Sequence, residues 1–68
     1  MNRVYWIDAT KVQPQNARAV LVYLPNVLSG TMSIGYWVES QGHWQEDPTG
    51  NYWNDGAVSH WAELPEKP

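Results

Sequence analysis

The chain has 68 residues, a formal net charge of −3 and no cysteine. That length allows one domain with a small core, residues 1–68, and the lack of cysteine excludes a disulfide framework and a thiolate metal site. No apolar stretch reaches the roughly 18–20 residues of a membrane span, and the N-terminus lacks the pattern of a signal peptide, so we expect a cytoplasmic protein with no membrane partner.

The first third of the chain contains one segment with strong strand character. Residues 8–18 show little β pattern, and Asp8 can cap a single helical turn over residues 9–11. A continuous apolar run then extends from Ala19 to Leu24 and stops at Pro25. An apolar run of this kind is buried on both faces, which predicts the central strand of a sheet.

Residues 31–39 alternate with a period of two and predict a second strand. One side carries Met32, Ile34, Tyr36 and Val38, and the other carries Ser33, Gly35 and Trp37. Gly35 in mid-strand indicates either a ring lying flat over the backbone or a bulge. Ser40-Gln41-Gly42 has the length of a three-residue hairpin loop, which predicts an antiparallel return over residues 43–46.

The last third of the chain contains two turns and a closing strand. Residues 47–51 include a proline and a glycine at turn spacing, Tyr52-Trp53 can form a short strand, and residues 54–56 form a second turn. Residues 57–64 alternate again. The whole pattern predicts an all-β domain, a small curled antiparallel meander of four to five strands with a short N-terminal helical turn or loop.

Several strings along the chain resemble a known family. They are Trp6-Ile7, Pro14, VLVY at 20–23, IGYW at 34–37, Trp44, and VSHWAELP at 58–65. In this order and spacing they resemble the phage and prophage domain-of-unknown-function family numbered 551, whose most specific string is the closing H-W-x-x-L-P. The sequence departs from the family pattern at Asp8, Gln13 and Asn16-Ala17. The resemblance implies a phage or prophage origin and an all-β fold, and it implies no activity.

Nothing in the sequence predicts catalysis, a cofactor or a bound metal. The two histidines, His43 and His60, lack the partner ligands of a zinc site. Ser59 and His60 are neighbours that strand geometry would point to opposite faces, which argues against a nucleophile and base pair. We expect His60 to be packed against a backbone carbonyl and His43 to be exposed. An enzyme or a small-ligand binder is therefore the weakest alternative.

The aromatic residues and the acids supply the candidate binding surface. Tyr-Trp occurs three times, and neighbouring rings in a strand face opposite ways, so one core face cannot hold them all. Trp6, Trp44, Trp61 and Tyr23 are assigned to the fold. The candidate partner-binding residues are Trp37, Tyr52, Trp53, Glu46, Asp47 and Asp55.

Charge decides the class of partner. From Ala19 to Glu66 the chain has no lysine or arginine, which disfavours direct binding to nucleic acid and favours a host protein with a basic surface. The leading hypothesis is a non-enzymatic, phage-derived accessory protein in the host cytoplasm that binds and inhibits a host protein, for example an anti-CRISPR or another anti-defence inhibitor. The alternative is a self-associating structural module, such as a homodimer formed through the outer rings. If residues 1–18 fold over the second face of the sheet, they bury the remaining rings. If they do not, these rings form an exposed aromatic surface.

Overall fold

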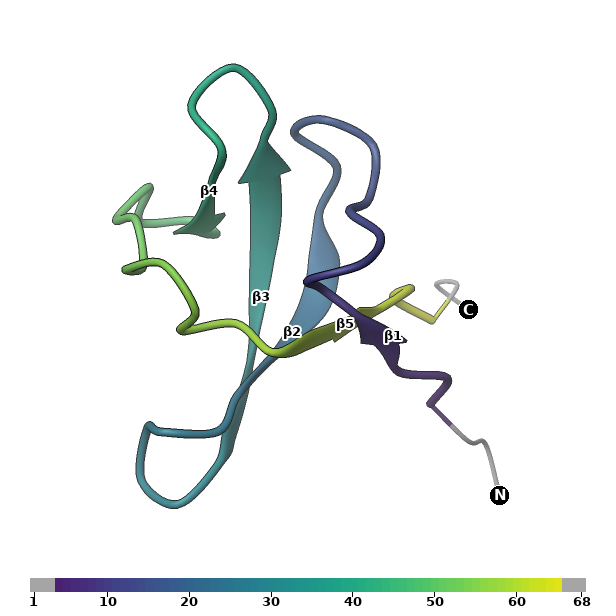
Figure 1. Cartoon of the computed structure of the whole chain (residues 1–68), viewed down its shortest axis with the longest axis vertical. Coiled ribbons are helices and arrows are strands. Elements are labelled where there is room, and N and C mark those ends of the chain that lie inside the picture. The colour runs from purple at the N-terminus through teal and green to yellow at the C-terminus, as the bar shows by residue number, and fades with distance from the viewer. Residues whose placement is uncertain (1–3, 66–68) are drawn as a thin grey trace.

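The computed structural model describes residues 4–65 and shows one twisted antiparallel sheet, with no helix in this range (Figure 1). The strands are β1 (Ile7–Asp8), β2 (Val20–Leu24), β3 (Thr31–Val38), β4 (His43–Glu46) and β5 (His60–Ala62). The predicted all-β antiparallel fold is confirmed. Within residues 4–65, then, no helix could cross a membrane.

The order of the strands across the sheet is β1-β5-β2-β3-β4. β2, β3 and β4 follow one another as the predicted meander, whereas β5 pairs with both β2 and β1. β3 pairs with one edge of β2 and β5 pairs with the other, so β2 is the central strand that its apolar character predicted. β5 is shorter than the predicted strand 57–64, since the alternating pattern there includes residues of the preceding loop.

The β3–β4 connection differs by one residue from the predicted three-residue loop. Val38 pairs with His43 and Trp37 with Trp44, so four residues, 39–42, form the loop. Gly42 ends it with a φ of 65°, and its N–H donates to the Val38 carbonyl at 2.8 Å. A one-residue change in register moves every side chain of a strand to the other face. Trp44 therefore lies on the same face as Trp37, which the shorter loop would not have allowed.

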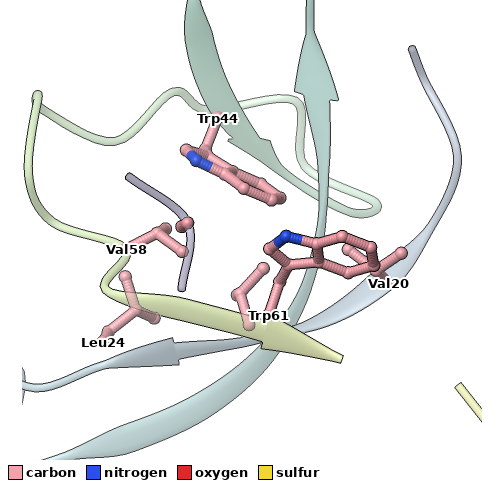
Figure 2. Close-up of a cluster of buried hydrophobic side chains, with 7 residues drawn as sticks. Val20, Leu24, Trp44, Val58 and Trp61 are labelled. Carbon is pink, nitrogen blue, oxygen red and sulfur yellow. The ribbon is translucent and has the colours of Figure 1, made fainter. Parts of the chain in front are cut away.

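One face of the sheet carries the hydrophobic core. β2 contributes Val20, Val22 and Leu24, all buried, and Trp61 from β5 pairs with Val22 on the same face. Figure 2 shows these side chains gathered into one cluster with Trp44 at the top, the Trp61 indole at the same level as Val20, and Val58 and Leu24 on the other side of the view. The core is thin, because among residues 4–65 only Val20 and Val22 are large side chains that are fully buried.

The N-terminal segment covers this same face. Asp8 initiates the predicted single turn, with the N–H groups of Lys11 and Val12 both donating to its carbonyl at 3.1 Å. The indole N–H of Trp61 then donates to the Val12 carbonyl at 2.8 Å. Pro14 and Ala9 are buried as a consequence. The segment 9–14 thus lies over the core, whereas Met32 and Ile34 on the opposite face of the sheet are exposed.

Candidate partner-binding site

Three indoles meet at one end of the covered face. Trp37 on β3 and Trp44 on β4 are cross-strand partners whose rings form an edge-to-face pair with centroids 5.5 Å apart. The backbone N–H of Trp53 donates to the Trp44 carbonyl at 2.9 Å, which fixes the chain beside β4. The ring of Trp53 lies close to Gly35, which agrees with a neighbouring ring, one of the two alternatives that the mid-strand glycine indicated. Trp37 and Trp53 stay partly exposed at the border of the core.

A pocket of about 160 Å³ opens beside these indoles. Its wall is mostly apolar, and its polar residues come from the N-terminal turn, from His43 at the start of β4 and from the turn after Trp53. The lining residues are Ala9, Thr10, Trp37, Gly42, His43, Trp44, Trp53, Asn54, Asp55, Gly56 and Val58. Such a volume is smaller than the ~300 Å³ or more of a drug-sized ligand site and is comparable to that of one amino-acid side chain.

Asp55 supplies the negative charge of the pocket. It lies exposed in the turn 54–57, which is closed by a 3.0 Å hydrogen bond from the Ala57 N–H to the Asn54 carbonyl. Gly56 follows with a φ of 80°, a conformation that glycine adopts without strain. Asp55 is thus both exposed and part of the pocket lining, so its carboxylate is accessible to a cation.

Residues 4–65 contain two lysine or arginine side chains, Arg18 and Lys11. Arg18 forms an ion pair with Glu63, and both side chains are half-exposed. Lys11 is exposed in the N-terminal turn and lowers the pKa of Asp8, although the two hydrogen bonds from Thr10 lower it more. Neither basic residue lines the pocket.

The structure separates the six candidate residues into three groups. Trp37, Trp53 and Asp55 converge on the pocket. Tyr52 forms an isolated bridge with Gln45 and stacks on His43 at 5.2 Å, which places it on the opposite face of the sheet. Glu46 is the last residue of β4, and Asp47 follows it in the next turn. The Glu46 carboxylate accepts a hydrogen bond from the Thr49 hydroxyl at 2.7 Å. These last two acids do not line the pocket.

Sequence reasoning missed Trp44 as a member of this site. Trp44 was assigned to the fold, which is right as far as its burial goes. Its place in the pocket wall depends on the four-residue loop, and the signal was Gly42, since a glycine with positive φ can close a four-residue loop as well as a three-residue one.

Both expectations for the histidines were wrong. His43 is half-buried against the Tyr52 ring, because the shifted register brings it to the same face of the sheet as Tyr52. The Nδ1 atom of His60 lies 2.8 Å from the Ser59 hydroxyl rather than against a backbone carbonyl. Ser59 precedes β5, so the alternation of strand side chains does not separate these two residues.

The nearest cross-strand carboxylate, Asp8, is not hydrogen-bonded to the Ser59–His60 pair. Asp8 is the cross-strand partner of His60, yet its Oδ1 atom accepts hydrogen bonds from Thr10 instead. Neither Ser59 nor His60 lines the pocket. Within residues 4–65 no group of three or more potential ligands could hold a metal ion.

Comparison with protein-family models, curated proteins and solved structures finds no match to this chain. The site is a pocket lined by three indoles, with the carboxylate of Asp55 in its lining, on a small antiparallel sheet.

Proposed function

We propose that this chain is a non-enzymatic binding protein that attaches to a basic surface of a host protein and inhibits it by occlusion. The observation that carries the proposal is the convergence of Trp37, Trp53 and Asp55 on one side-chain-sized pocket. Indole rings attract cations through their π faces, and a carboxylate at the rim adds a charge-assisted hydrogen bond. The pocket is thus suited to an arginine or lysine side chain of the partner.

The overall charge supports the same class of partner. The net charge of −3, with no basic residue between Ala19 and Glu66, favours approach to positive surfaces and repels phosphate backbones. A small acidic protein anchored in this way can block a basic channel that otherwise holds nucleic acid. The inhibitory part of the proposal, including its form as an anti-CRISPR or other anti-defence inhibitor, rests on this charge and on the resemblance to the phage family.

Peptide titration tests the pocket. We expect a short arginine-containing peptide to shift the indole N–H signals of Trp37 and Trp53 in NMR spectra, and an otherwise identical glutamine-containing peptide to leave them unchanged. Asp55→Asn should weaken binding roughly five-fold, which corresponds to about 1 kcal/mol for a solvent-exposed cation contact. Glu63→Gln is the matched control, because it removes one negative charge at a residue that does not line the pocket.

If the two substitutions weaken binding equally, only the net charge of the chain matters. If the peptide does not bind at all, the pocket is not the binding site and this part of the proposal is wrong. Inhibition has a separate test: the purified chain should displace a labelled oligonucleotide from a CRISPR effector complex or another host nucleic-acid-binding defence protein. If the oligonucleotide stays bound to every such protein at saturating concentrations of the chain, the inhibitory role is wrong.

A further inference from the structure

The indoles that line the pocket stand at different angles to one another. The rings of Trp37 and Trp44 form a corner, with an angle of 63° between their planes and centroids 5.5 Å apart. Trp53 reaches the same pocket from the loop after β4, where its backbone N–H is bonded to the Trp44 carbonyl. Trp37 and Trp53 are partly exposed, whereas Trp44 is buried behind them. A group that enters the pocket is therefore bordered by more than one aromatic ring.

The hydrogen-bonding side chains of the pocket are few, and half of them already have partners. They are Thr10, His43, Asn54 and Asp55. The Thr10 hydroxyl donates to the Asp8 carboxylate at 2.6 Å, and the Nε2 atom of His43 lies 3.2 Å from a side-chain amide of β4. Within residues 4–65 no hydrogen bond engages the side chains of Asn54 and Asp55, which are neighbours in one exposed turn. The free acceptors thus lie together in one segment of the lining, and the indoles supply much of the rest.

This lining favours a cation that carries few N–H groups. The ammonium of an unmodified lysine is strongly hydrated and has three N–H donors, and arginine has five. Donors that lose their water against indole carbon without gaining an acceptor carry a free-energy cost. Methylation of the ammonium keeps the positive charge and replaces N–H donors by methyl groups, which need no acceptor. Aromatic cages bind quaternary ammonium groups for this reason.

We infer that the pocket binds the trimethylammonium group of a methylated lysine on the partner protein. This inference rests on the proposed function and narrows the side chain that the partner supplies. The volume agrees with it, because the pocket holds about 160 Å³ and an apolar cavity of about 150 Å³ holds a benzene molecule. A trimethylammonium group with the end of its methylene chain is of similar size. Asp55 then acts through its charge, since a trimethylammonium group donates no hydrogen bond from nitrogen.

Titration with four matched peptides tests the inference on the unchanged chain. Each is the same short glycine and serine peptide with one variable residue: trimethyl-lysine, lysine, arginine, or the neutral analogue of trimethyl-lysine in which carbon replaces the nitrogen. The indole N–H signals of Trp37 and Trp53 in NMR spectra report binding. Trimethyl-lysine should bind roughly ten-fold more tightly than lysine, and the neutral analogue, which has the same shape, roughly five-fold more weakly than trimethyl-lysine.

A pair of variants locates the contact. Trp53→Leu removes one indole of the pocket and should abolish the preference for trimethyl-lysine over its neutral analogue. Tyr5→Leu is the matched control, because it removes an aromatic ring that is 82% exposed and does not line the pocket. It should leave the preference unchanged. If Trp53→Leu fails to fold, the comparison of the charged and neutral peptides on the unchanged chain decides.

The outcomes separate this inference from the proposed function. Lysine or the neutral analogue binding as tightly as trimethyl-lysine would overturn the inference, while binding of the arginine peptide would leave the proposed function standing. Trimethyl-lysine binding without arginine or lysine binding would support the inference and contradict attachment to an unmodified basic surface. Binding of none of the four peptides would refute both. Choline alone is the last arm: if it binds as tightly as the trimethyl-lysine peptide, the ligand is a free or lipid-borne quaternary ammonium compound, and a partner side chain is the wrong source.

Discussion

The Trp53 ring lies so close over Gly35 that a Cβ atom at Gly35 would come within 2.7 Å of the Trp53 Cζ3 atom. The same Cβ would lie 2.8 Å from the Gln45 backbone carbonyl oxygen, which cannot rotate away. The glycine is thus required by packing rather than by backbone conformation, and it links the central hairpin to the loop that carries the pocket.

Gly35→Ala should therefore destabilise the fold. We expect a loss of about 1–3 kcal/mol in the free energy of unfolding, the usual cost of overpacking a tight site, measured by urea denaturation. Combining Gly35→Ala with Trp53→Ala should cost less than the sum of the two single changes, because the second change removes one of the two clashes. Strict additivity would show that the ring over Gly35 does not constrain this position.

A second prediction concerns the hydrogen bond that holds the N-terminal segment over the core. Trp61→Phe removes the indole N–H that donates to the Val12 carbonyl at 2.8 Å, while Trp44→Phe truncates an equally buried indole for which residues 4–65 show no such bond. Both changes cost packing, so the difference between them isolates the bond. Trp61→Phe should cost about 1 kcal/mol more than Trp44→Phe and should speed amide exchange at residues 9–14. Equal losses, with no local change in exchange, would contradict the prediction.

The sequence predicted the strands well and the contacts between distant segments poorly. The apolar run ending at Leu24, the alternation of β3, the ring over Gly35 and the turn at Asp8 are local patterns, so each could be predicted from neighbouring residues. The place of β5 beside β2 depends on which edge stays open, a property of the whole sheet.

The candidate site shows the same limit. Trp37, Trp53 and Asp55 were predicted from composition and exposure, and they lie together. Tyr52 was predicted with them, but it lies on the other face of the sheet. It pairs with Gln45 of β4, and the one extra residue in the β3–β4 loop decides which face Gln45 occupies. The face on which residues 9–14 pack is likewise determined by no local pattern of the sequence, because it depends on the contact between Trp61 and Val12.

The ion pair between Arg18 and Glu63 should contribute little to stability. Both side chains are half-exposed, so water screens the attraction, and exposed pairs are worth about 0–1 kcal/mol. We expect Arg18→Gln, Glu63→Gln and the double variant each to change the free energy of unfolding by less than about 1 kcal/mol. A double-mutant cycle in low and high salt measures the coupling. A coupling energy well above that range that persists in high salt would mean that the pair is shielded from solvent in solution.

The carboxylate of Asp8 makes stability depend on pH. Its side chain accepts hydrogen bonds from the Thr10 hydroxyl at 2.6 Å and the Thr10 N–H at 2.9 Å, and these bonds lower the pKa of Asp8 below its ordinary value, with smaller contributions from the charges of Lys11 and His60. A carboxyl whose pKa is lower in the folded than in the unfolded state stabilises the fold fully above the unfolded pKa, and this contribution is lost as the pH falls through the folded pKa.

The free energy of unfolding should therefore decrease as the pH drops below about 4, where an ordinary aspartate titrates. In Asp8→Asn this part of the decrease should be missing, because the amide does not titrate. Thr10→Ala should raise the pKa of Asp8 toward its ordinary value, since it removes the hydroxyl bond, the largest cause of the shift. NMR titration of the Asp8 carboxyl checks this directly. An Asp8 pKa that Thr10→Ala leaves unchanged would show that the Thr10 hydroxyl does not stabilise the carboxylate in solution.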